Sequence, residues 1–288
     1  MRRSPAQWWF GGRAVSRLAV LGYHGVDDPE GFARQLDRLT RIARPVSLDE
    51  VEHAIEHRRP LPGRAVLITF DDGERSVLEH GLPLLRERGL PAVAFVIPSL
   101  VGTDTPFWWH EVDRLVAAGA GAERSTAAWL RHLKTVPQAE RLADLDRLRA
   151  GRAAVRQTQL TADEVRALDA GGVRVENHSL THPLLDRCDD ADIRTEIGEA
   201  HDLLTKILGR APRSFAYPNG NWDARAERLL HELGYTTAFL FDHRLGPRLP
   251  DQPLRVSRLR VASGTPPDRF ETILSGLHPA VHGLRGRG

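Results

Sequence analysis

The chain has 288 residues, of which 41% are hydrophobic and 27% charged, and its formal net charge is +2. This is the composition of a folded globular protein and excludes a largely disordered chain. Nucleic acid is not expected as a partner, because the arginines are spread along the chain instead of forming one basic stripe. The single cysteine, Cys188, excludes an internal disulfide and a cysteine-rich metal site.

The N-terminal residues 1–24 are basic, but Arg13 and Arg17 interrupt any apolar segment, so that a secretion signal is not predicted. No apolar stretch of the sequence is long enough to cross a bilayer. We therefore expect a cytoplasmic protein. The aromatic cluster Trp8–Phe10 lies beside basic residues and indicates a second possibility, peripheral contact with a membrane surface.

Short apolar segments alternate with amphipathic segments along most of the chain. The predicted strands are residues 17–26, 64–73, 91–99, 172–179, 213–220 and 235–241. The predicted helices are residues 31–43, 47–58, 76–89, 161–172, 192–209 and 224–234. Several strands are apolar on consecutive residues, which is typical of strands covered on both faces. The repeated strand-then-helix order predicts an α/β fold with a mostly parallel sheet or barrel, whose functional groups lie at the carboxyl ends of the strands.

Helix ends are marked by residues of the expected types. Ser47 with Glu50, and Thr161 with Glu164, match the capping-box pattern at the start of a helix. Four glycines stand where predicted helices should end: Gly89, Gly171, Gly209 and Gly234.

One region breaks the alternation. Residues from about 107 to 158 are rich in arginine and largely helical in pattern, and we interpret them as an insertion that covers one side of the core. We expect one domain at residues 17–275, with an N-terminal tail at 1–16 and a C-terminal tail at 276–288.

Two adjacent acids, Asp71 and Asp72, end one predicted strand, and His178 and His182 lie at the end of another. One interpretation of Asp-Asp-Gly is a simple turn, because both residue types are common in turns. The alternative is a catalytic zinc site, in which two histidines and one carboxylate bind the metal and leave a position open for water. The second aspartate would then accept the proton of that water. The location of both pairs at strand ends favours the zinc site.

Six motifs follow one another along the chain: "GYHGV" at Gly22–Val26, "TFDDG" at Thr69–Gly73, "FWWHEV" at Phe107–Val112, "LTADEVRALDAGGV" at Leu160–Val173, "HSLTH" at His178–His182 and "FAYPNG" at Phe215–Gly220. Together they resemble the polysaccharide deacetylase (NodB-homology) family, which is carbohydrate esterase family 4. The resemblance covers residues 17–275.

This resemblance implies a distorted (β/α) barrel with fewer strands than the regular eightfold barrel. It also implies metal-dependent removal of an acetyl group from an N-acetylated sugar. By the same resemblance, Asp71 is the catalytic base, and the metal ligands are Asp72, His178 and His182. The expected metal is Zn²⁺, with Co²⁺, Ni²⁺ or Mn²⁺ as alternatives. The backbone N–H of Asn219, in the third motif of the family, would bind the oxyanion.

The sequence departs from the family pattern at two places. Many members carry an arginine in the third motif that orients the base, and Ala216 occupies that position here. Many also end with a leucine-histidine motif whose histidine protonates the leaving amine, but "PLRVSRLRVAS" contains no histidine, and His278 and His282 lie outside its context. We expect His24 to replace it, because it is similar to an N-terminal histidine in deacetylases of bacterial poly-N-acetylglucosamine. A histidine titrating near neutral pH suits this role; the alternative is a core histidine at a strand end.

Aromatic residues near these motifs are candidates for binding sugar rings. Trp222 and Trp109 are candidates for stacking, and Tyr217 is a further candidate contact. The alternative for each is packing, and for Tyr217 it is a structural role at the end of its strand. Asp242 ends another predicted strand, where it either contacts the site or faces solvent.

Three functions remain open from the sequence. The first is an N-deacetylase that acts on an acetylated sugar oligomer, a polymer such as an exopolysaccharide, or a lipid-linked glycan. The second is a carbohydrate O-acetyl esterase, because the same attack by water cleaves an ester. The third is a catalytically inactive glycan-binding or assembly protein.

Overall fold

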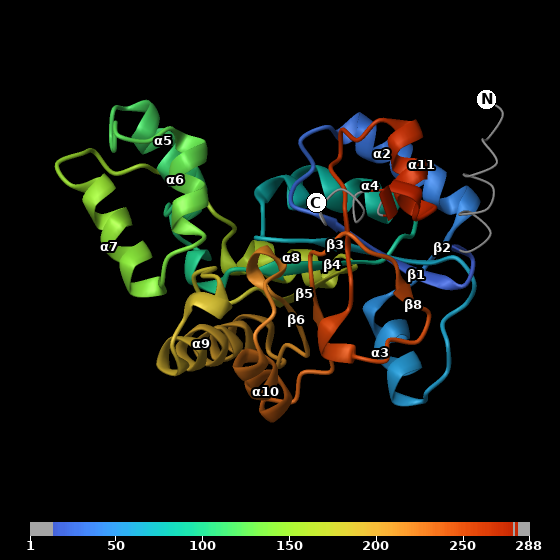
Figure 1. Ribbon diagram of the computed structural model, residues 1–288. Helices are drawn as coiled ribbons and strands as arrows, with labels where there is room; N and C mark the ends of the chain where they lie inside the picture. The colour runs from blue at the N-terminus through green and yellow to red at the C-terminus, as the bar shows by residue number, and fades with distance from the viewer. Residues whose placement is uncertain (1–13, 279, 282–288) are drawn as a thin grey trace.

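The computed structural model describes residues 14–278, 280 and 281, and it shows a curled, mostly parallel sheet surrounded by helices (Figure 1). The main strands run parallel to their neighbours in the order β1 (Arg17–Tyr23), β3 (Ala65–Phe70), β4 (Ala92–Val96), β5 (Val173–Asn177), β6 (Ser214–Ala216) and β7 (Thr237–Phe239). Three short strands extend the sheet: β2 (Arg44–Pro45) beside β3, and β8 (Gly246–Pro247) and β9 (Leu259–Arg260) beside β1.

The sheet curls far enough for one segment to bridge its two ends. Val256 forms an isolated parallel bridge with Phe239 of β7, and Leu259 of β9 pairs with Leu21 of β1. Residues 256–260 therefore lie between β7 and β1. The prediction of a distorted α/β barrel is confirmed.

Helices cover the outside of the sheet: α2 (Pro29–Ile42), α3 (Leu48–Glu56), α4 (Leu82–Glu87), α8 (Ala162–Ala170), α9 (Asp190–Leu208), α10 (Ala224–Glu232) and α11 (Pro267–Leu274). Both predicted capping boxes are present at the starts of α3 and α8. Gly209 caps α9 with a φ of 70°, a left-handed conformation that glycine adopts without steric cost.

The predicted helix at 76–89 consists of two kinds of helical turn, and Pro83 is the second residue of the α-helical part. A π-helical turn, Val77–Gly81, precedes α4, and the N–H of Leu82 bonds to the carbonyl of Val77. Proline has no N–H for the carbonyl four residues earlier, and its ring clashes with that carbonyl, which favours a wider turn before it. The predicted helix is therefore present, with a π-helical turn in its first half that the sequence pattern did not predict.

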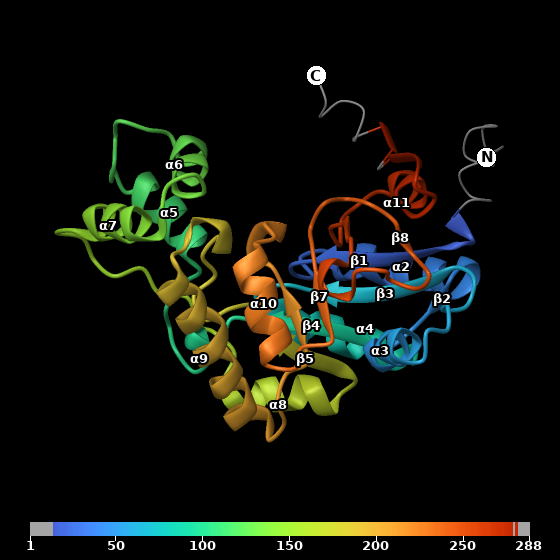
Figure 2. The ribbon, with the colours of Figure 1, turned by 60° about the horizontal axis from the view of Figure 1, so that its bottom comes forward.

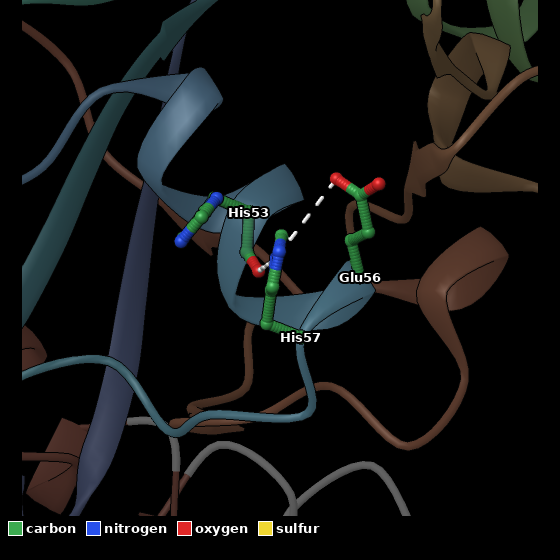
Figure 3. Close-up of side chains that lie close together, drawn as sticks. All are labelled: His53, Glu56 and His57. Carbon is green, nitrogen blue, oxygen red and sulfur yellow. Dashed lines mark hydrogen bonds and ion pairs between the residues drawn. The ribbon is translucent and has the colours of Figure 1, made fainter.

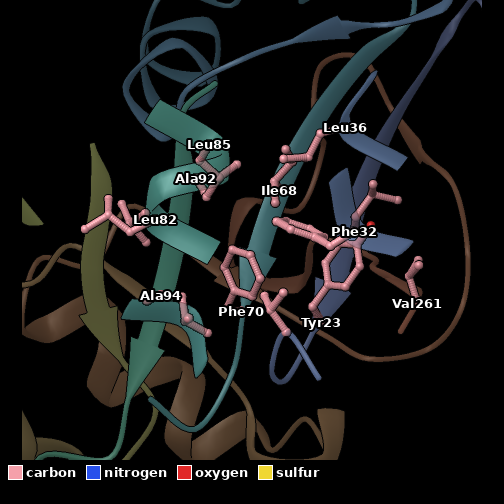
Figure 4. Packing of buried hydrophobic residues seen from close by; sticks show 14 of the residues in the cluster. Tyr23, Phe32, Leu36, Ile68, Phe70, Leu82, Leu85, Ala92, Ala94 and Val261 are labelled. Carbon is pink, nitrogen blue, oxygen red and sulfur yellow. The ribbon is translucent and has the colours of Figure 1, made fainter. Parts of the chain in front are cut away.

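The main strands are buried on both faces, as their continuous apolar sequences predict. In β1, Leu18 and Val20 pack into one cluster of buried residues, whereas Ala19 and Leu21 join another. Figure 4 shows the second cluster, in which Phe32 of α2 packs against the aromatic side chains of β1 and β3. This double-sided burial fixes the strand register, because a shift by one residue would exchange the two faces.

The insertion forms three helices, α5 (Trp108–Ala117), α6 (Thr126–Leu133) and α7 (Gln138–Arg149). Figures 1 and 2 both show these helices projecting from one side of the barrel. They pack around a small core of their own, in which Trp129 is fully buried. The insertion is therefore a side subdomain with its own apolar centre, and it contacts the barrel through particular side chains described below.

No helix within the described residues is both long and apolar enough to cross a membrane. The aromatic cluster Trp8–Phe10, on which the idea of surface contact rests, lies outside the described residues, as does His282.

A buried carboxylate ties β5 to β6. Glu176 is fully buried and accepts hydrogen bonds from the backbone N–H groups of Arg213 and Ser214 at 2.7 and 2.8 Å. Its other oxygen accepts from the guanidinium groups of Arg174 and Arg210 at 2.8 and 3.2 Å. These bonds fix the spacing of the two strands just before the residues with candidate functions.

We expect Glu176→Ala to lower the free energy of unfolding by about 3 kcal/mol, because two arginines and two N–H groups lose a shared buried partner. Urea denaturation measures this loss. Glu199→Ala, at an exposed position on α9, is the control and should change stability by less than about 0.5 kcal/mol. Equal losses in the two variants would contradict a structural role for the network.

Candidate active site

The predicted functional residues follow four of the parallel strands. His24 comes directly after β1, Asp71 and Asp72 after β3, His178 after β5, and Asn219 follows β6. Because these strands are parallel, their carboxyl ends lie at the same rim of the barrel. The fold thus places residues that are distant in sequence at one rim.

The Asp-Asp-Gly segment is a turn and part of this site at the same time. Asp72 and Gly73 have φ values of 69° and 82°, so that the chain turns sharply at the end of β3. In a continuous strand, successive side chains point to opposite faces. After this turn, both carboxylates approach the same atom, Nε2 of His178, at 4.0 Å for Asp71 and 3.4 Å for Asp72. The turn interpretation and the site interpretation are therefore compatible.

Asp72, His178 and His182 form a buried cluster whose ligand atoms lie within 4.8 Å of one another. Asp72 Oδ1 is 3.4 Å from His178 Nε2 and 3.6 Å from His182 Nε2, and among the described residues this oxygen has no hydrogen-bond partner. His178 Nδ1 lies 2.8 Å from the carbonyl of Ala216. That bond requires a proton on Nδ1 and leaves the Nε2 lone pair directed at Asp72, as in a metal-ligating histidine.

Two other groups of residues within the described part of the chain have ligand atoms equally close together. His53, Glu56 and His57 lie exposed at the C-terminal end of α3 (Figure 3), and the second group is His132, Glu140 and Asp144 in the insertion. In the first group, His57 Nδ1 already contacts the carbonyl of His53. In the second, His132 and Asp144 pair directly at 2.6 Å. The Asp72 cluster differs from both because all three of its residues are buried.

The protonation states of the side chains in this cluster favour binding of a cation. Burial alone would raise the pKa of Asp72, but the nearby His178 and His182 lower it below its ordinary value. Burial, together with repulsion from His178, lowers the pKa of His182 to about 3, which keeps this imidazole neutral. Burial also disfavours a charge on His178, yet Asp71 and Asp72 outweigh it and raise the pKa of His178. A carboxylate and a neutral imidazole are the forms that bind a divalent metal, and the carboxylates favour positive charge between them.

Arg258 holds the second carboxylate, and the sequence analysis did not identify it. Its Nη1 and Nη2 donate to Asp71 Oδ1 and Oδ2 at 2.6 and 2.8 Å, and the arginine is fully buried. Its Nε donates to the carbonyl of Leu240 and its Nη1 also to Thr69 Oγ1. Although burial opposes it, this pairing lowers the pKa of Asp71, so that the carboxylate stays ionised.

The arginine expected near Ala216 is thus supplied by another segment, the one that bridges β7 and β1. Arg258 is two residues after the buried Val256, which places both side chains on the same face of the extended chain. Asp242 supports this segment by accepting bonds from the hydroxyl of Ser257 and the N–H of Arg258. The alternation of apolar and polar residues in "VSRLRV" indicates a strand, but the segment is too short to predict which strands it pairs with.

The insertion holds His182 in place. Trp108 Nε1 donates to the carbonyl of His182 at 3.2 Å, and Arg141 Nη1 donates to the same oxygen at 3.3 Å. Arg141 is buried, lies over the Trp108 ring and bonds to Gln138. His182 has a φ of 59°, a conformation that is unfavourable for a non-glycine residue and needs such support.

His24 lies on the open side of the cluster. Its side chain is 54% exposed, and its Nε2 is 4.0 Å from Asp72 Oδ2. Its ring packs edge-on against Phe241 at 5.4 Å. This position is that of a group able to meet a substrate, unlike a histidine buried in the core.

The three aromatic candidates lie in different environments. Trp109 is half-buried, with its ring 4.7 Å from that of His182. Trp222 is exposed, but the guanidinium of Arg255 lies 4.0 Å over its ring. Tyr217 is fully buried and donates its hydroxyl to the carbonyl of Leu254, which agrees with the structural interpretation of this residue.

Comparison with known proteins places these residues in a family context. The family model for polysaccharide deacetylase matches residues 58–155 and 150–238, which together are more than half of the chain. The poly-beta-1,6-N-acetyl-D-glucosamine N-deacetylase of Escherichia coli (strain K12) is 31% identical over 101 residues. That match covers 31% of this chain and only 15% of the relative's length.

Solved structures with the same fold align over nearly the whole chain. IcaB from Ammonifex degensii has a TM-score of 0.64 and 22% identity, with 91% of this chain and 97% of IcaB covered. The Streptococcus pyogenes deacetylase PplD, solved in complex with acetate, has a TM-score of 0.63 and 17% identity, with 90% and 98% covered. At these identities the likeness establishes the fold.

We expect Arg141→Met to weaken Zn²⁺ binding about tenfold, because the peptide carrying His182 loses one of the two donors that hold its carbonyl. Competition with a chromophoric chelator measures the affinity. Arg194→Met, at an exposed position on α9, should leave the affinity unchanged. If the two variants bound Zn²⁺ equally well, Arg141 would have no part in positioning the ligand.

Proposed function

The chain belongs to the polysaccharide deacetylase family, and on this premise we propose that it hydrolyses the acetamido group of an N-acetylated sugar in a glycan. The observation that carries the proposal is the buried cluster of Asp72, His178 and His182 with the Asp71–Arg258 pair beside it. One set of residues can hold a divalent cation, and the adjacent carboxylate is free of that task. Hydrolysis of an amide by water requires both a group of ligands for the cation and a separate base that accepts the proton of the water.

We propose Zn²⁺ as the cation, held by Asp72, His178 and His182. Two imidazoles and one carboxylate are a common protein ligand set for catalytic zinc, and they leave a position open. Co²⁺, Ni²⁺ and Mn²⁺ accept similar ligands and are the alternatives. When bound, the cation would polarise the acetyl carbonyl and make a water molecule acidic enough to attack it.

The residues of the chain have distinct tasks in this reaction. Asp71, oriented by Arg258, accepts a proton as the water oxygen bonds to the acetyl carbon. The backbone N–H of Asn219 donates to the oxygen of the former carbonyl, where negative charge develops. His24 then gives a proton to the nitrogen as the C–N bond breaks, so that acetate and a free amino sugar leave. The exposed position of His24 at the open side of the cluster supports this task.

The two alternative functions differ in what they need from the site. An O-acetyl esterase would use the same residues on an ester. Two departures suggest a catalytically inactive binding protein: Ala216 at the position of the base-orienting arginine, and the missing histidine of the C-terminal motif. Arg258 weakens that suggestion, because it makes the expected pair of bonds with Asp71 from another segment. An intact base with its arginine favours an enzyme.

We expect the Zn²⁺-loaded protein to release acetate from β-linked N-acetylglucosamine oligomers, and Asp71→Asn to lower this rate at least about 1,000-fold with the metal still bound. Released acetate and metal content are measured on the same samples. His178→Ala is the matched comparison and should lose both the metal and the activity. Release of acetate only from O-acetylated sugars would establish the esterase, and binding of oligomers without any release would establish the binding protein.

His24→Ala should lower kcat about 100-fold on the amide substrate and leave the Zn²⁺ content unchanged, because only protonation of the leaving nitrogen is lost. A substrate with an activated ester, whose leaving group needs no proton, should lose much less activity. His80→Ala, outside the site, is the control. Equal losses on the amide and the activated ester would show that His24 is not the general acid.

A further inference from the structure

Two basic side chains border the candidate active site and are not used by the proposed reaction. Lys134, directly after α6 of the insertion, donates from Nζ to Asn219 Oδ1 at 3.0 Å. Arg260, in β9, donates from Nε and Nη2 to the carbonyl of Phe241 at 2.8 and 2.6 Å. The ring of Phe241 in turn lies edge-on to His24. Each cation thus lies next to a proposed catalytic residue or one side chain away from it.

Within the part of the chain that the structure describes, neither Lys134 nor Arg260 forms an ion pair with a carboxylate. Both residues are exposed. Partial desolvation and repulsion from Arg260 lower the pKa of Lys134, while attraction to Asp72 raises it. The two cations therefore act on each other and on the metal-ligand cluster, although protein carboxylates do not neutralise them.

The charges inside the site do not account for this pair. Asp71 and Asp72 are already balanced by the divalent cation of the proposed function, and Arg258 adds a further positive charge. A neutral N-acetylated sugar offers no anion to Lys134 or Arg260. The product amino sugar is itself a cation, which like charges nearby would repel. The two positive charges therefore disfavour binding of a neutral glycan and favour binding of a glycan that carries negative charge.

We propose that Lys134 and Arg260 form an anion subsite that binds a carboxylate or phosphate group on the acetylated sugar or on its neighbour in the glycan. This inference rests on the proposed function and narrows its substrate class to acidic glycans. Two separate donors, one ammonium and one guanidinium, suit an anion with several oxygens. The insertion supplies Lys134, so that it contributes to specificity as well as to the position of His182.

The test compares two oligomers of equal length, one of N-acetylglucosamine alone and one in which it alternates with glucuronic acid. For the Zn²⁺-loaded protein we expect kcat/KM to be at least about tenfold higher on the acidic oligomer, mainly through KM, and this preference to shrink as salt is added. A third oligomer carrying a 6-phosphate distinguishes phosphate from carboxylate as the preferred anion.

Lys134→Gln and Arg260→Gln should each remove most of the preference for the acidic oligomers. The controls are Lys206→Gln, which changes the other lysine of the chain, and Arg228→Gln, at an exposed position on α10. Both controls should retain the full preference. Preference of the parent protein for the neutral oligomer would overturn the proposal. An equal loss of kcat by Lys134→Gln on neutral and acidic oligomers would also overturn the proposal. Lys134 would then stabilise the oxyanion of the reaction instead of binding an anion of the substrate.

Calorimetry with the Asp71→Asn variant separates this proposal from the proposed function, because it measures binding without turnover. Tighter binding of acidic than of neutral oligomers, lost when Lys134→Gln is added, supports the subsite even if no substrate releases acetate. Acetate release together with equal binding of all oligomers would leave the hydrolase intact and overturn the subsite.

Discussion

The burial of two adjacent carboxylates is the constraint on which the rest of the site depends. Asp71 and Asp72 are 3% and 5% exposed, and such a pair is stable only if other groups compensate its charge. Arg258 compensates one carboxylate through two hydrogen bonds, and His178 approaches both. The compensating groups come from separate segments, so that the barrel must be assembled before the acids are tolerated. The charge compensation of the site therefore depends on closure of the barrel.

The sequence predicted those parts of the fold and site that depend on local pattern. Continuous apolar segments located the main strands, and parallel topology then placed Asp72 and His178 at one rim. Arg258 could not be predicted in the same way, because its contact depends on how a two-residue strand aligns with β1. The contacts of the insertion could not be predicted from the sequence either. Arg141 and Lys134 bond to partners 41 and 85 residues away, and no short motif encodes the packing that brings them together.

The insertion is attached to the barrel as a subdomain with its own interior. Its helices have their own core, so its interior can change without disturbing the barrel. Its contacts with the rim include three hydrogen bonds and one aromatic contact: Trp108 and Arg141 bond to the carbonyl of His182, Lys134 bonds to Asn219, and the Trp109 ring lies beside that of His182. A subdomain attached in this way can alter what surrounds the reacting group while the ligand cluster stays constant.

The segment at residues 256–260 closes the barrel with one isolated bridge and a strand of two residues. The backbone bonds of Val256 and Val261 and the side-chain bonds of Arg258 to Leu240, Thr69 and Asp71 also hold this seam, so that a local opening there would have to break all of them. Because Arg258 lies in the seam, such an opening would withdraw the guanidinium from Asp71 while the remaining strands stay paired. Such an opening would leave the buried Asp71 carboxylate without its counter-charge, so that closure of the seam and formation of the ion pair are expected to occur together.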